Sequence, residues 1–175
     1  MLLPDVNVLI YAHFEDIVAE HAEYAHWVTQ LATGPEPFAL SVLVLSGFVR
    51  FATNSWIFDP PATLATAFDF VSSLVDRTTA RVVGPGPDHL SIFERLCREA
   101  SATGKLVADA QHAAVAVEHG CTLVSTDSDF NRFAGPSVAA PASPARSVMP
   151  LPLCGANPQH VLPLPAMVWF SYRHP

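Results

Sequence analysis

The sequence predicts an α/β protein built as a three-layer α/β/α sandwich around a central, mainly parallel sheet. Short apolar runs of the kind found in buried strands alternate with longer segments whose apolar residues recur at helical spacing. Alternation of this kind favours parallel strands joined by crossover helices that cover both faces of the sheet. Half of the 175 residues are apolar, which is enough for a sizeable core.

The first half of the chain is expected to hold two strands and four helices. In order, these are a strand at 2–5, helices at 7–12 and 19–31, a strand at 38–40, and helices at about 41–53 and 61–75. Gly34-Pro35 ends the second helix, and Ser41 is a candidate N-cap for the third.

The second half continues the alternation, with a strand at 81–83, a helix at 88–102, a helix beginning at Asp109 and a strand at 122–126. The helix that begins at Asp109 is the best defined of these. Its apolar face recurs at i, i+3, i+4 and i+7, in Ala110, Ala113, Ala114 and Val117. Gly120 follows where a left-handed C-cap belongs.

The composition changes near Gly135. Beyond Ala134 the chain has only two charged residues but nine of its sixteen prolines. Proline blocks both helices and central strands. We therefore expect one domain at 1–134, followed at 135–175 by a Pro-rich tail that is disordered or atypical and forms no regular pairing.

Charge and cysteine usage limit the class of protein. A net charge of −7 does not favour binding of nucleic acid by bulk electrostatics. It does not exclude a nuclease, because carboxylates that hold cations also make a chain acidic. Cys97, Cys121 and Cys154 form neither a zinc pattern nor a disulfide framework. With no signal peptide and no apolar run long enough for a bilayer, a cytoplasmic protein without a membrane anchor is expected.

Carboxylates lie at the ends of two expected strands. Asp5 ends the first strand, and Asp127 follows the strand at 122–126. The carboxyl ends of parallel strands share one edge of the sheet, and the helix that begins at Asp109 starts at that edge. Topology alone therefore brings Asp5, Asp109 and Asp127 together, and Asp129 is close enough in sequence to join them.

Such a cluster would suit a hard divalent cation. Carboxylate oxygens without Cys or His favour Mg²⁺ or Mn²⁺ over Zn²⁺. These cations activate water and stabilise charge on a phosphodiester. Two plainer interpretations remain open on the pattern alone: Asp109 as a helix N-cap, and Asp127 with Asp129 as a turn.

Three segments that contain these residues resemble PIN-domain toxins of the VapC type. Residues 4–12 (PDVNVLIYA) are similar to their opening, and residues 45–54 (LSGFVRFATN) to their middle helix. Residues 107–114 (VADAQHAA) and 123–130 (LVSTDSDF) are similar to their closing half. The resemblance spans residues 1–134, with the segments in the family's order.

The resemblance implies a metal-dependent endoribonuclease toxin that uses Mg²⁺ or Mn²⁺, cleaves RNA, forms a homodimer and is neutralised by a VapB-type antitoxin. Asp5, Asp109 and Asp127 would take the family's catalytic, metal-binding roles, with Asp129 as a further ligand. Asn7 and Thr126 match polar residues that support those carboxylates. Arg50 is a candidate for holding a substrate phosphate.

The chain departs from the family's pattern in two places. No carboxylate occurs between Glu36 and Asp59, although the family carries a glutamate in its middle helix; Gly47 or Val42 stands there instead. The family's short final strand is also not apparent after Gly135. A catalytically weak PIN domain that binds other proteins is therefore an alternative. A phosphatase is a weaker one, because Asn7 replaces the second aspartate expected there.

Overall fold

The computed structural model describes residues 1–141; the expected tail from residue 142 onward lies outside the described residues. Within the described part, five strands form one sheet in the order β3-β2-β1-β4-β5, and all neighbouring strands are parallel. The strands are β1 (Leu2–Pro4), β2 (Phe38–Ser41), β3 (Ala80–Val83), β4 (Thr122–Val124) and β5 (Ser137–Ala139). The expected parallel sheet is confirmed.

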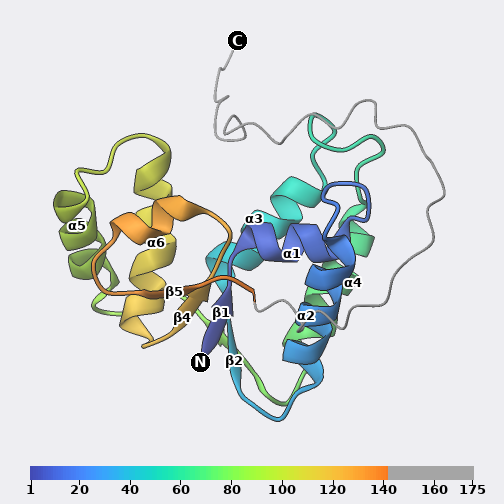
Figure 1. The fold of residues 1–175 in the computed structure, drawn as a ribbon, viewed down its shortest axis with the longest axis horizontal. Helices are drawn as coiled ribbons and strands as arrows, with labels where there is room; N and C mark the ends of the chain where they lie inside the picture. Colours follow the sequence, from blue (N-terminus) through green and yellow to red (C-terminus); the bar gives the residue numbers. More distant parts are fainter. Residues whose placement is uncertain (142–175) are drawn as a thin grey trace, which may run out of the picture. The chain divides into compact units, whose positions relative to one another are not determined.

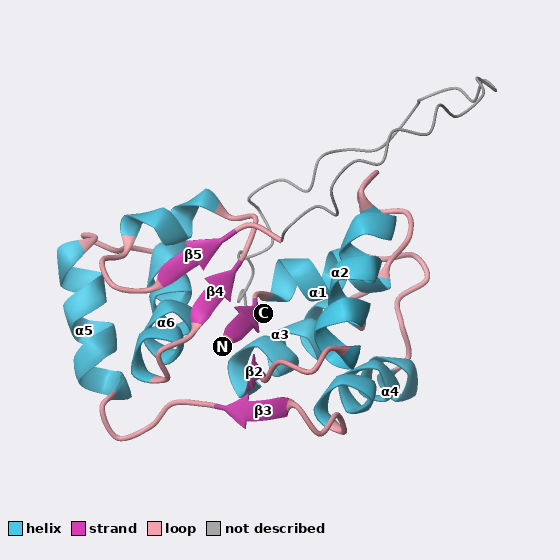
Figure 2. Ribbon diagram, turned by 60° about the horizontal axis from the view of Figure 1, so that its bottom comes forward, coloured by secondary structure: helices cyan, strands magenta, loops and turns pink. Residues whose placement is uncertain are grey.

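Six α-helices flank the sheet within residues 1–141. They are α1 (Val6–His13), α2 (His21–Thr33), α3 (Val42–Ala52), α4 (Leu64–Val75), α5 (His89–Glu99) and α6 (Lys105–Glu118). Figures 1 and 2 show α5 and α6 on one side of the sheet and α1, α2 and α4 on the other, which confirms the three-layer sandwich. None of the helices in the described residues has the length and apolar character needed to cross a membrane.

The start of α6 differs from the expectation. The helix begins at Lys105, after Gly104 with a φ of 55°, rather than at Asp109. Leu106 in the added turn is buried and continues the apolar face that the alanines define further along. Asp109 therefore lies inside the helix, so its interpretation as an N-cap is wrong.

The end of the sheet also differs from the expectation. Ser137–Ala139 forms β5, which pairs in parallel with β4, so the sheet continues past the expected boundary at 134. The pairing is reinforced at its end, where the Ser125 N–H donates to the Ala139 carbonyl at 3.0 Å. An edge strand of three residues tolerates the preceding Pro136, which is why composition alone concealed it.

The register of the two central strands positions the next residues along the chain. Pro4 of β1 is paired with Val124 of β4, and the Asp5 N–H donates to the Val124 carbonyl at 2.9 Å. Leu3 and Leu123 are fully buried beside this pair and anchor both strands in the core. Asp5 and Ser125 are thus brought side by side at the carboxyl edge of the sheet.

Candidate active site

Asp5 is buried where β1 passes into α1. It is the N-cap of α1, where its Oδ1 accepts the Val6 N–H at 2.7 Å, and its Oδ2 accepts the Ser125 hydroxyl at 2.8 Å. Only 3% of Asp5 is exposed. Burial raises the pKa of Asp5 to about 6, although both hydrogen bonds lower it. Asp5 is thus a fixed carboxyl group whose charge needs a nearby cation.

Asp109 is the second buried carboxyl group and comes from the second turn of α6. Burial raises the pKa of Asp109 to about 6 as well, and the charge of Asp127 adds to the rise. Its Oδ2 has no hydrogen-bond partner within the described part of the chain. A buried carboxylate oxygen without a donor is costly, unless a cation compensates it.

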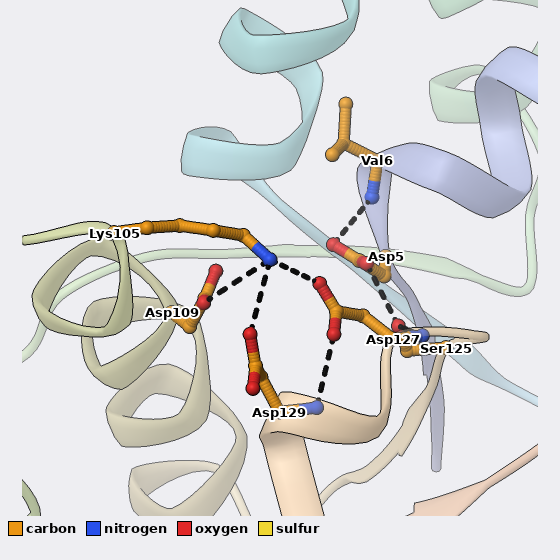
Figure 3. A network of polar contacts seen from close by, with 7 residues as sticks. All are labelled: Asp5, Val6, Lys105, Asp109, Ser125, Asp127 and Asp129. Atoms are coloured by element: carbon orange, nitrogen blue, oxygen red, sulfur yellow. Dashed lines mark hydrogen bonds and ion pairs between the residues drawn. The ribbon is translucent and has the colours of Figure 1, made fainter. Parts of the chain in front are cut away.

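Asp127 and Asp129 follow β4 and do form a turn. Asp127 caps a short 3₁₀ segment (Ser128–Arg132) by accepting the Asp129 N–H at 2.9 Å. The turn also delivers both carboxylates to Asp109. One carboxylate oxygen from each of Asp109, Asp127 and Asp129 lies within 4.8 Å of the other two. The turn after β4 therefore positions two of the three carboxylates of the cluster (Figure 3).

Lys105 supplies a cation that the sequence interpretation missed. Its Nζ donates to Asp127 Oδ2 at 2.6 Å and to Asp129 Oδ2 at 3.2 Å. It also lies 3.8 Å from Asp109 Oδ2. Burial alone would lower the pKa of Lys105, but these carboxylates raise it above its ordinary value. For Asp127 the directions are reversed. Burial alone would raise its pKa, but Lys105 and the Asp129 N–H hold it below the ordinary value.

Ser125, the neighbour of Thr126, contacts two of the site's aspartates. Ser125 is buried, donates to Asp5 and accepts the Asp127 N–H at 3.0 Å, so it links the two carboxylates. Thr126, the next residue, is exposed. Asn7, the other expected supporting residue, lies half-buried in the first turn of α1.

Arg50 and the position of the absent glutamate both lie on α3. A Cβ at Gly47 would lie 3.5 Å from the side chain of Val6, the residue after Asp5, whereas Val42 lies against Gly84. Gly47 is therefore the position beside the site. Arg50, one turn later, is exposed, and its guanidinium lies 4.7 Å from the centre of the Phe51 ring.

The residues present fit a hard divalent cation. Three carboxylates converge, their donors are all oxygen, and one buried oxygen has no hydrogen-bond partner among the described residues. Oxygen-only sets of this kind suit Mg²⁺ or Mn²⁺. Asp109, Asp127 and Asp129 are the residues that would hold such an ion, with Asp5 adjacent and joined to Asp127 through Ser125.

A model of the PIN domain matches residues 2–136 of this chain. The chain belongs to the PIN-domain family. Within this PIN domain, the sequence is 42% identical over 134 residues to ribonuclease VapC31 of Mycobacterium tuberculosis, which covers 77% of this chain and 94% of that protein. The same identity and coverage relate it to ribonuclease VapC25 of the same species. The resemblance stated from the motifs is confirmed.

Solved structures share the fold of this PIN domain. VapBC2 from Rickettsia felis, bound to a DNA fragment from its promoter, matches with a TM-score of 0.59 at 16% identity, over 79% of this chain and 97% of that one. VapC20 of Mycobacterium tuberculosis, described as a sarcin-ricin loop cleaving toxin, matches with a TM-score of 0.57 at 17% identity, over 82% and 100%. At such identities the likeness concerns the fold alone.

Proposed function

We propose that the protein is a metal-dependent endoribonuclease toxin that cleaves RNA with Mg²⁺ or Mn²⁺ held by Asp109, Asp127 and Asp129. One observation carries the proposal: three carboxylates converge at the carboxyl edge of the sheet in a PIN domain that is 42% identical to proteins named ribonucleases. Asp5 completes the proposed catalytic set through its bridge to Asp127.

The chain's own residues have separable roles in this proposal. Asp109, Asp127 and Asp129 bind the cation, and Asp5 with Ser125 fixes the position of Asp127. When bound, the cation supplies activation of water and stabilisation of negative charge on the phosphodiester. Arg50 is exposed on α3 and is proposed to hold a phosphate of the substrate. A guanidinium binds a phosphate through two parallel hydrogen bonds.

A VapB-type antitoxin and a second copy of the chain are the proposed protein partners. Proteins that share this fold are described as VapBC complexes. This chain also exposes large apolar side chains, Trp56 in the connection between α3 and α4, and Leu64 and Phe68 on α4. Exposed apolar surface of this kind favours burial in an assembly. The free thiols of Cys97 and Cys121 are consistent with the cytoplasmic location that we propose.

Cleavage of RNA by the purified full-length protein tests the proposal. We expect cleavage with Mg²⁺ or Mn²⁺ and none in excess EDTA. Asp5→Asn, Asp109→Asn and Asp127→Asn should each lower the rate by about 10² or more, because transition-state charge stabilisation is lost. Asp129→Asn should have a smaller effect. Asp69→Asn, an exposed carboxylate on α4, is the matched control. Undiminished cleavage in EDTA would overturn the metal mechanism.

The absence of a carboxylate at Gly47 favours one second candidate, a catalytically weak PIN domain that acts by binding other proteins. The same assay separates the two functions. A protein that binds an antitoxin but cleaves RNA no faster than its Asp109→Asn variant would be the binding module. Faster RNA cleavage by the parent protein than by the Asp109→Asn variant would identify the enzyme.

A further inference from the structure

Lys105 is the only lysine in the 175-residue chain, and it lies among the carboxylates of the candidate site. Its Nζ lies 2.6 Å from an oxygen of Asp127, 3.2 Å from Asp129 and 3.8 Å from Asp109. These are the same three residues whose oxygens gather within 4.8 Å. Figure 3 shows the ammonium group pointing into the space that the three carboxylates share.

The location of Lys105 is unfavourable unless these contacts compensate it. It is the first residue of α6, where the helix dipole favours negative rather than positive charge. Its side chain is 29% exposed, so it gives up part of its hydration as well. The three carboxylates offset both costs, and the ammonium in turn reduces their mutual repulsion. Lys105 therefore does for the cluster what a bound cation would do.

We propose that Lys105 is a displaceable counter-ion, which holds the carboxylate cluster together in the metal-free protein and leaves when a divalent cation binds. The inference rests on the metal site of the proposed function, not on the cleavage of RNA. Mg²⁺ and Mn²⁺ bind through carboxylate oxygens at close range, so the ammonium and the metal ion compete for the same oxygens of Asp127 and Asp129.

Charge repulsion opposes occupation of the cluster by both cations at once. An ammonium and a dication a few ångströms apart repel strongly where water is partly excluded. The long side chain of Lys105 starts at the helix end and is partly exposed, so it can turn toward solvent without movement of α6. Metal affinity is consequently lower than the carboxylates alone would give.

Chemical labelling of the unmodified full-length protein tests the release directly. Because Lys105 is the sole lysine, every ε-amine adduct found by mass spectrometry reports on it. We expect a small acylating reagent at fixed pH and ionic strength to label Lys105 several-fold faster with saturating Mn²⁺ than in EDTA. The α-amine of Met1 is the internal reference. Equal or slower labelling in Mn²⁺ would show that Lys105 is not released, and would overturn the proposal.

A variant provides the second measurement. Lys105→Met removes the charge but keeps a long apolar stem, and should bind Mn²⁺ about tenfold more tightly by calorimetry, because no cation has to be displaced. In EDTA it should melt at a lower temperature than the parent protein. Arg95→Met, which removes one exposed positive charge on α5, is the matched control and should bind Mn²⁺ like the parent.

The outcomes distinguish this inference from the proposed function. If Mn²⁺ binds but Lys105→Met binds it no more tightly, the displacement is wrong while a metal-dependent nuclease remains supported. If Mn²⁺ binds and releases Lys105 but RNA stays intact, the displacement holds and the proposed nuclease function fails. If neither protein binds Mn²⁺, both are overturned.

Discussion

The hydroxyl of Ser125 donates a hydrogen bond of 2.8 Å to Oδ2 of Asp5, across 120 residues of sequence. The same hydroxyl oxygen accepts the Asp127 N–H at 3.0 Å. One buried serine thus joins the carboxyl group that follows β1 to the loop that follows β4. It is the direct link between the two halves of the candidate site.

Replacing Ser125 should therefore cost more than replacing its neighbour. Ser125→Ala leaves the Asp127 N–H without its acceptor and Asp5 Oδ2 without its hydroxyl donor, so we expect a loss of about 1–3 kcal/mol in the free energy of unfolding. Thr126→Ala, at an exposed position, should change it by about 0.5 kcal/mol or less. Urea denaturation of both variants measures the difference. Equal losses would mean that Thr126 supports the site after all.

Metal binding should depend on pH in the range set by Asp5 and Asp109, whose pKa values burial raises to about 6. Below that value both groups retain protons that a cation must displace, so Mn²⁺ affinity should rise with pH from 5 to 7 and then level off. Calorimetry in two buffers of different ionisation enthalpy should show proton release at pH 6 and little at pH 8. A pH-independent affinity between 5 and 7 would contradict this assignment.

The stability of the metal-free protein should follow the same groups. Because the pKa values of Asp5 and Asp109 are raised, their contribution is present below the ordinary value of 3.8 and is lost as the pH rises through 6. The pKa of Asp127 is lowered, so its contribution is present above 3.8 and is lost in acid. We expect the rise in Tm produced by Mn²⁺ to be larger at pH 7 than at pH 5. An equal rise in Tm at pH 5 and pH 7 would show that Asp5 and Asp109 do not titrate in this range.

Restoring a carboxylate on α3 should strengthen the site. A Cβ at Gly47 makes an ordinary contact of 3.5 Å with Val6, so a larger side chain is accommodated there. Gly47→Glu should tighten Mn²⁺ binding, because it adds negative charge beside Asp5, whereas the isosteric Gly47→Gln should not. Calorimetry of both variants decides. Identical affinities would place residue 47 outside the reach of the metal.

The C-terminal boundary can be tested by truncation. Ending the chain after Pro141 keeps β5, and we expect the fold and any metal-dependent cleavage to persist. Ending it after Ala134 removes β5, exposes the edge of β4 and takes away the acceptor of the Ser125 N–H. The shorter protein should melt at a lower temperature. If both truncated proteins behave alike, β5 contributes nothing to the domain.

The sequence by itself determined the layer architecture and the edge of the sheet at which Asp5 and Asp127 lie. Strands and helices are local periodicities, and parallel connection places the residues after β1 and β4 at one edge, so the sequence predicts that Asp5 and Asp127 share that edge. The order of three motifs was enough to indicate the PIN domain. Each of these depends on spacing along the chain, which a sequence records directly.

Only the tertiary structure decided which neighbours serve those aspartates. Ser125 and Thr126 are adjacent polar residues, and the pairing of β4 between β1 and β5 is what turns one inward and leaves the other exposed. Lys105 precedes the segment with the clearest helical period, so its i, i+4 relation to Asp109 appears only once α6 is seen to begin there. Such contacts depend on side-chain direction and on non-local pairing, which periodicity along a single chain does not encode.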